Sequence, residues 1–159
     1  MEAVIRYKLL KEHNLHIVYV EGKVNFFDLL SYMNKLYKDK NYSPDYNVID
    51  DLRNAQLEFS QEDIKKCIKI FEVKSESMTR TNLTKFAILT KTPEQVVKAF
   101  LYRKYAKNLS VVFEVFSTVF SAIDWLLLKD FSESDYNAII EKLKGKSQHN
   151  KMHNHYTQH

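Results

Sequence analysis

Three consecutive segments decide the fold class: Thr84-Lys85-Phe86-Ala87-Ile88-Leu89, Thr92-Pro93-Glu94-Gln95 and Val111-Val112-Phe113-Glu114-Val115-Phe116. The first and third predict strands, and the third is apolar enough for a strand that is covered on both faces. The middle segment predicts a helix start, because Thr92 can cap the helix, Pro93 suits its first position and Gln95 can complete a capping box. This helix is expected to run to about Lys107. A strand, a helix and a strand in this order predict a right-handed crossover between parallel strands.

The chain before this unit continues the alternation. Residues 4–10 and 15–20 are predicted to pair as an antiparallel hairpin, because the polar connection between them is far too short for a parallel crossover. A helix capped by Asn25 follows, and then a short strand over residues 46–50. Ser60 is expected to cap the next helix, with Asp63 as the acidic half of a capping box.

The chain after this unit adds two helices. One begins at Ser117 or Thr118, and the other covers residues 132–144 and ends at Gly145 as a C-terminal cap. We therefore predict an α/β sandwich domain over residues 1–130, an additional helix over 131–145 and a disordered tail, rich in His, Asn and Gln, over 146–159. The sheet is expected to be mixed but mostly parallel, with about five strands, and to be packed by four to five helices.

Composition excludes several classes of protein. Two glycines and two prolines in 159 residues disfavour phosphate-binding glycine loops and tight-turned all-β folds. Cys67 is the only cysteine, which excludes an internal disulfide and a cysteine-based metal cluster. The longest apolar run is too short to span a bilayer, and the first ten residues do not resemble a signal peptide. We expect a cytoplasmic protein without stable membrane insertion. Its net charge of +4 is too small to indicate a polyanionic partner.

One further segment resembles a known family: Val48-Ile49-Asp50-Asp51-Leu52-Arg53-Asn54-Ala55, followed by Leu57 and by Ser60 at a helix start. Together with the order of elements over residues 4–128, it resembles the SpoIIAA-like, or STAS-like, family. The resemblance implies a binding module of a bacterial regulatory system. It also implies that Ser60 holds the position of the serine that is phosphorylated in anti-sigma-factor antagonists. Related folds bind lipids or other apolar ligands.

Asp51 and Arg53, with Asp50 beside them, are the first candidate site residues. They are expected at the carboxyl end of a central strand, where open α/β sheets bind ligands. Two carboxylates can divide acid and base roles or hold a metal, and an arginine can bind an anion. Consecutive residues of a strand point to opposite faces, however, so the alternative is an ion pair that shapes the turn, and we favour this alternative.

Ser60 is the third candidate. A helix N-terminus favours a phosphoserine, because the exposed backbone amides and the helix dipole attract negative charge. An ordinary N-cap explains the same serine, and the acidic residues around it would repel a phosphate, so we favour the cap. Cys67 lies on the apolar stripe of the same helix and is expected in the core.

Apolar and basic side chains suggest two surfaces. The helix after Thr92 is expected to face the core with Val96, Val97, Phe100, Leu101 and Tyr105. Its outer side carries Lys98, Arg103, Lys104 and Lys107, which we interpret as a solvated helix face and not as a nucleic-acid site. A surplus of tyrosines is expected to line an exposed apolar patch for a ligand or a second copy of the chain: Tyr32, Tyr42, Tyr46, Tyr102 and Tyr136.

Three functional hypotheses follow. The first is a non-enzymatic regulatory or protein-interaction module that self-associates as a homodimer and contacts its partner near Asp51, Arg53 and Ser60. The second is a binder of a small apolar or lipid-like ligand in a pocket near Arg53. The third is a hydrolase or transferase, which would require Asp50 and Asp51 to meet in one cleft. No cofactor and no specific metal site is expected, because the C-terminal histidines, His149, His153, His155 and His159, lack carboxylate or cysteine partners.

Overall fold

The computed structural model describes residues 1–76, 78 and 82–153. Its centre is a five-stranded sheet in the order β1-β2-β3-β4-β5. The strands are β1 (Val4–Leu10), β2 (Leu15–Asn25), β3 (Asn47–Glu58), β4 (Thr84–Leu89) and β5 (Val111–Phe116). β1 pairs antiparallel with β2 as an edge strand, and the other neighbours are parallel. The predicted mixed, mostly parallel α/β sheet with an N-terminal hairpin is confirmed.

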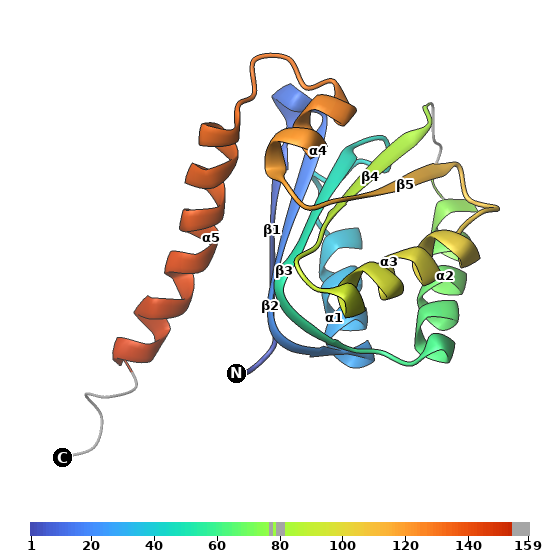
Figure 1. The fold of residues 1–159 in the computed structure, drawn as a ribbon, viewed down its shortest axis with the longest axis horizontal. Coiled ribbons are helices and arrows are strands. Elements are labelled where there is room, and N and C mark those ends of the chain that lie inside the picture. The colour runs from blue at the N-terminus through green and yellow to red at the C-terminus, as the bar shows by residue number, and fades with distance from the viewer. Residues whose placement is uncertain (77, 79–81, 154–159) are drawn as a thin grey trace.

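In the part of the chain that the structure describes, five α-helices cover the two faces of this sheet (Figure 1). On one face lie α1 (Phe26–Tyr37), α2 (Gln61–Glu76) and α3 (Pro93–Tyr105). On the other face lie α4 (Val119–Leu126) and α5 (Glu133–His153). The result is a three-layer sandwich, as expected when crossovers place helices on both sides of a parallel sheet.

The helix starts follow the predicted capping residues. The Asn25 side chain accepts hydrogen bonds from the amides of Phe27 and Asp28. Thr92 and Gln95 form the predicted reciprocal capping box at the start of α3. The Thr118 side chain accepts a hydrogen bond from the Ser121 amide and caps α4. Each cap satisfies backbone N–H groups that have no partner within the helix, which fixes where the helix begins.

β3 is longer than predicted. It runs to Glu58 instead of ending at Asp50, and its pairing with β4 stops at Asp51. Tyr19 of β2 pairs with Asp51, and the next recorded pair is Glu21 with Asn54. Over this stretch β2 advances by two residues and β3 by three. The additional residue is a β-bulge, which reverses the alternation of side chains along the strand. The predicted strand end is therefore wrong, and the candidate residues lie in the middle of β3.

The bulge is held by the first turns of α3. Gln95 is buried, and its amide nitrogen donates to the carbonyl oxygens of Leu52 (2.7 Å) and Ala55 (2.8 Å). One turn later the Lys98 ammonium donates to the carbonyl oxygens of Leu57 and Phe59. These contacts satisfy carbonyls on the part of β3 that extends beyond its pairing with β4.

The same contacts explain why the predicted inward face of α3 is only partly right. Leu101 and Tyr105 pack against the core as predicted, but Val97 and Phe100 do not. Gln95, Ala99 and Ala106 are buried, whereas Val97 and Phe100 are 57% and 49% exposed. The helix is rotated so that Gln95 and Lys98 reach the carbonyls of β3, and this rotation turns the two apolar side chains outward. Hydrophobic periodicity alone cannot weigh such polar contacts against burial.

The C-terminal helix differs from its prediction. α5 begins at Glu133 and continues past Gly145 to His153. Gly145 is not among the glycines with positive φ, and a Cβ atom built on it meets nothing within 4 Å. The predicted cap at Gly145 is wrong, because an exposed glycine weakens a helix without ending it. Residues 154–159 of the predicted tail lie outside the described residues. Among the described helices, none is long and apolar enough to cross a membrane.

Candidate functional site

A cavity of about 150 Å³ lies between the sheet and helices α1, α2 and α3. Aliphatic side chains from three strands form its floor: Val18, Val20, Val48, Leu57 and Ile88. Aromatic side chains form much of the rest: Tyr32, Tyr37, Tyr42, Tyr46, Phe59, Phe71, Phe86, Tyr102 and Phe113. An apolar cavity of about this volume holds a molecule the size of benzene.

Asp50 is the acidic residue in this wall. It is surrounded by protein, and burial raises the pKa of its carboxyl group from 3.8 to about 7. The residue nevertheless keeps some solvent-accessible surface, which we assign to the cavity that it lines. Desolvation is the cause of this pKa shift, with no contribution from a hydrogen bond or a nearby charge. Buried carboxylates are normally paired, so this one is a feature that packing does not explain.

His16 and Tyr32 form a second polar group in the wall. The Tyr32 hydroxyl lies 3.2 Å from Nε2 of His16, and the two rings are stacked 6.3 Å apart. Burial lowers the pKa of His16 from 6.5 to about 4, so the imidazole is neutral at pH 7. Burial, together with the charge of Asp50, raises the pKa of Tyr32 well above its usual value. The pair therefore supplies hydrogen-bonding groups without charge.

Tyr102 and Lys98 reach the cavity from α3. The Tyr102 ring packs against Phe113, with ring centroids 5.3 Å apart, and burial raises the pKa of its hydroxyl. The Lys98 ammonium lies 3.3 Å from the Glu94 carboxylate, in addition to its contacts with β3 carbonyls. Lys98 is thus already neutralised, and the capping of α3 by Gln95 fixes where both side chains enter the cavity.

The tyrosine surplus has a different role from the predicted one. Tyr32, Tyr42, Tyr46 and Tyr102 line the cavity, and Tyr136 is fully buried on the opposite face of the sheet. The prediction of an exposed tyrosine patch is therefore wrong. The strands and helices that carry these residues were predicted, but helical spacing alone does not tell a filled core from a hollow one.

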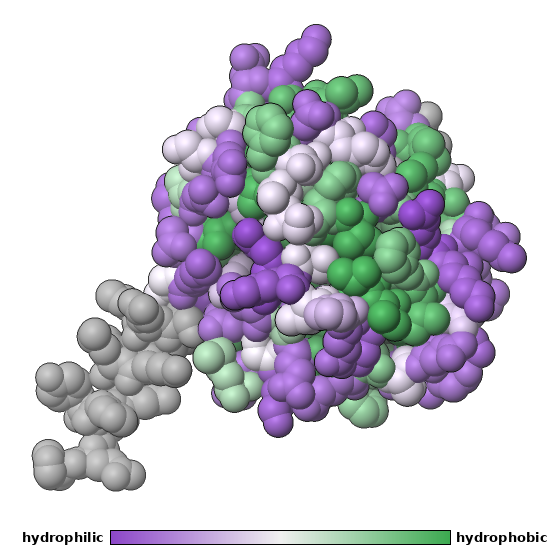
Figure 2. Space-filling model, in the orientation of Figure 1, coloured by the Kyte–Doolittle hydropathy of each residue, from purple (hydrophilic) through white to green (hydrophobic). Residues whose placement is uncertain are grey.

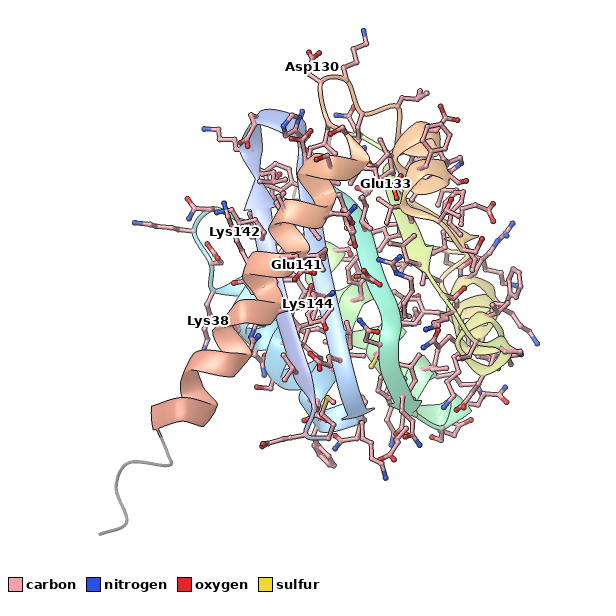
Figure 3. The ribbon with its side chains drawn as sticks, turned by 60° about the vertical axis from the view of Figure 1, so that its left-hand side comes forward. Lys38, Asp130, Glu133, Glu141, Lys142 and Lys144 are labelled. Atoms are coloured by element: carbon pink, nitrogen blue, oxygen red, sulfur yellow. The ribbon has the colours of Figure 1, made fainter. Side chains whose placement is uncertain are left out.

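Asp51 and Arg53 face away from this cavity, toward α5. The Arg53 guanidinium binds Asp51 in a bidentate manner, with Nε to Oδ1 at 2.8 Å and Nη2 to Oδ2 at 2.7 Å. The Tyr136 hydroxyl of α5 donates to the same Oδ2 at 2.9 Å. Asp51 is buried, and its hydrogen bond raises the pKa of Arg53. This geometry agrees with the favoured ion pair, which here attaches α5 to the sheet. Figure 3 shows α5 lying along this face of the sheet.

The positions of Asp50 and Asp51 contradict the hypothesis that the two carboxylates act together as acid and base. Asp50 lines the cavity under α1 to α3, and Asp51 contacts α5 on the other face of β3. The two carboxylates do not meet in one cleft, so they cannot act as a catalytic pair. This cavity is not the predicted pocket near Arg53, because neither Asp51 nor Arg53 lines it. Of the adjacent carboxylates, Asp50 lines the cavity and Asp51 does not, and contact of a ligand or partner by Asp51 and Arg53 remains a prediction.

Ser60 lies at the start of α2, outside the cavity wall. Its hydroxyl donates to Oδ2 of Asp63 at 2.7 Å and accepts from the Asp63 amide at 3.1 Å. The Asp63 carboxylate also accepts from the Ser60 amide, and these hydrogen bonds lower the pKa of Asp63. The predicted capping box is confirmed. Phosphorylation of Ser60 remains a prediction.

Other candidate groups do not form a site within the described part of the chain. No three His, Cys, Asp or Glu side chains there lie together as metal ligands would. Cys67 is buried, as predicted, and burial raises the pKa of its thiol to about 11, which is the reverse of what an activated nucleophile requires. Of the C-terminal histidines, His155 and His159 lie outside the described residues.

Comparison with known proteins supports the fold. No family model matches the sequence, and no curated protein matches it. Among solved structures, the chain is similar to a protein of the DUF3478 family from Shewanella loihica, which is described as having a SpoIIAA-like fold. The match covers 78% of this chain and 93% of that chain, with a TM-score of 0.51 and 13% identity. The predicted resemblance to a SpoIIAA-like fold is confirmed, and at this identity the likeness shows the fold alone.

Proposed function

We propose that this protein is a binding module that takes a small, mainly apolar ligand into the cavity between the sheet and helices α1, α2 and α3. The observation that carries the proposal is the cavity itself, because interiors of this kind are normally filled. An apolar wall with a few converging polar groups is the usual form of a small-molecule site. Asp50, His16, Tyr32 and Tyr102 are those polar groups here.

Retention of a ligand tests this proposal directly. Native mass spectrometry of freshly purified protein should show a small molecule bound to the chain. Ala99 lines the cavity and is buried, so Ala99→Leu should fill part of the space and reduce the bound fraction. Ala138 is exposed on α5, so Ala138→Leu is the matched control and should retain the ligand. If the wild-type chain is empty and no small apolar probe binds it, the proposal is wrong.

Self-association is a second candidate property, and one observation favours it. Val97 and Phe100 lie three residues apart on the outer side of α3, and both are about half exposed. Figure 2 shows an apolar surface over the region where α3 lies in Figure 1. Light scattering after size exclusion tests this candidate. A dimer that Val97→Lys converts to a monomer would support it, and a wild-type monomer would exclude it.

We also propose a regulatory role for this protein. A regulatory role would be the natural use of a binding module without a catalytic pair, and the SpoIIAA-like fold is what suggests it. Bacterial origin and a cytoplasmic location are predictions that come with that resemblance and with the single cysteine. A change of partner binding on ligand addition would support the regulatory role.

A further inference from the structure

We infer that the ligand of this cavity is a small organic cation, namely an amine whose ammonium group binds Asp50 while its apolar body fills the remaining space. This inference rests on the proposed function and names the chemical class of the ligand. Its basis is the charge balance of the cavity wall, together with the aromatic rings that surround it.

The first step is the missing partner of Asp50. Among the described residues, none forms a hydrogen bond or a salt bridge with the Asp50 carboxylate, and desolvation accounts for its raised pKa. An unpaired carboxylate inside a protein is unfavourable unless a cation or hydrogen-bond donors compensate for the lost water. A bound ammonium group would supply both the charge and the donors.

The ionisable side chains near Asp50 do not neutralise its charge. His16 is neutral at pH 7, because burial holds its pKa near 4. The Lys98 ammonium is occupied by Glu94 and by the backbone carbonyl oxygens of residues 57 and 59. Its charge does not contribute to the pKa of Asp50. The charge of Asp50 does influence Tyr32 and Tyr102, whose pKa values it helps to raise. The wall near Asp50 is therefore acidic, with neutral phenol groups around the carboxylate.

The third step is the aromatic lining. Tyr32 on α1 and Tyr102 on α3 face the cavity from two helices, and Phe86 and Phe113 face it from two strands. Aromatic faces attract organic cations, most strongly where water is excluded. The volume of about 150 Å³ suits a single ring or a short branched chain that carries one amino group.

Other ligand classes fit this wall less well. An anionic ligand would be repelled by Asp50. A neutral alcohol of the same shape could hydrogen-bond to the carboxylate but would leave its charge uncompensated. The difference between an amine and an alcohol of equal shape therefore isolates the inference from the existence of the cavity site.

Calorimetric titration with benzylamine, benzyl alcohol and toluene at about pH 8, where the amine is protonated and Asp50 is ionised, tests the inference. Wild-type protein should bind benzylamine about tenfold or more tightly than benzyl alcohol, because a charge-assisted hydrogen bond and cation–π contacts add together. Asp50→Asn should abolish that preference while binding of benzyl alcohol and toluene persists. Asp124→Asn, an exposed acid on the far face, is the control and should leave the preference unchanged.

The outcomes separate the two proposals. If the neutral probes bind and benzylamine does not bind more tightly, the cavity is a ligand site and the cationic class is wrong. The same holds if Asp50→Asn weakens all three probes equally. If none of the three binds and native mass spectrometry finds the chain empty, the proposed function fails as well.

Discussion

Asp50 is a buried acid without a hydrogen-bond or salt-bridge partner among the described residues, so its protonation is coupled to folding. Its pKa is about 7 in the folded chain and close to 3.8 when exposed. Between these values the folded chain holds a proton that the unfolded chain releases. The contribution of Asp50 is therefore fully present below about pH 4 and is lost as the pH rises through about 7.

Asp50→Asn should remove this loss. The variant is expected to be more stable than wild type at about pH 8 by on the order of 2–4 kcal/mol, since one pKa unit corresponds to about 1.4 kcal/mol. The difference should shrink as the pH approaches 4. Urea unfolding at several pH values measures it, with Asp124→Asn as the control. A difference that does not change with pH would contradict the burial of an unpaired carboxylate.

His16 acts in the opposite direction over nearly the same range. Its folded pKa of about 4 is lower than the ordinary 6.5, so its contribution is present above 6.5 and is lost as the pH falls toward 4. The two effects partly cancel in the wild type. In Asp50→Asn the His16 effect should stand alone, so that variant is expected to lose stability on acidification from about pH 6.5 to 4. Unfolding curves that are flat over this range in the variant would contradict a neutral, buried His16.

The sequence predicted Gln95 only as part of the capping box of α3, but in the structure its side chain also binds β3. Its side chain accepts from the Lys91 and Thr92 amides and donates to two carbonyls of β3. Gln95→Glu keeps the acceptors but loses the donor, and it places a carboxylate against the Leu52 and Ala55 carbonyls. We expect a loss of about 1–3 kcal/mol in the free energy of unfolding. Gln56→Glu on the exposed side of β3 is the matched control, and equal effects in the two variants would contradict the role of Gln95.

Hydrogen bonds from Tyr136 and to Leu143 attach α5 to the sheet. Tyr136 donates to the buried Asp51 carboxylate, and Arg6 donates to the Leu143 carbonyl. Tyr136→Phe removes one hydrogen bond to a charged group, which should cost about 1.5–3 kcal/mol. Amide hydrogen exchange should show the largest loss of protection in α5. Unchanged protection in α5 would show that packing alone holds this helix.

The continuity of α5 through Gly145 can be tested by one substitution. Because the glycine does not adopt a positive φ and its Cβ position is open, Gly145→Ala should stabilise the helix by about 0.5–1 kcal/mol. Far-UV circular dichroism should then show equal or greater helicity. A decrease would restore the predicted helix end, since alanine is strained in a left-handed C-terminal cap.

The positions of helices and strands were predicted from sequence more reliably than which of their side chains face the core. Strong local signals, such as the Thr92 cap and the apolar strand at Val111–Phe116, located elements that the structure confirms. The bulge in β3 and the rotation of α3 depend on carbonyls of one element meeting side chains of another. Such contacts leave no periodic signal, which is why the sequence did not predict that Asp50 would line a cavity.

At the scale of the whole molecule, the sheet separates two halves with different properties. The half under α4 and α5 is packed, with Tyr19, Tyr136 and Asp51 buried in it. The half under α1, α2 and α3 contains the cavity and the unpaired Asp50. We propose that the first of these halves has a structural role and that the second binds a ligand.

Methyl chemical-shift mapping by NMR with toluene as the probe tests that claim most directly. Saturable shifts are expected at methyl groups that line the cavity: Val18, Val20, Val48, Leu57 and Ile88. Ile17 and Ile49, which are buried on the α4–α5 face, should not shift. Saturable shifts at Ile17 and Ile49, or no saturable shift at any methyl group, would contradict ligand binding in the half under α1, α2 and α3.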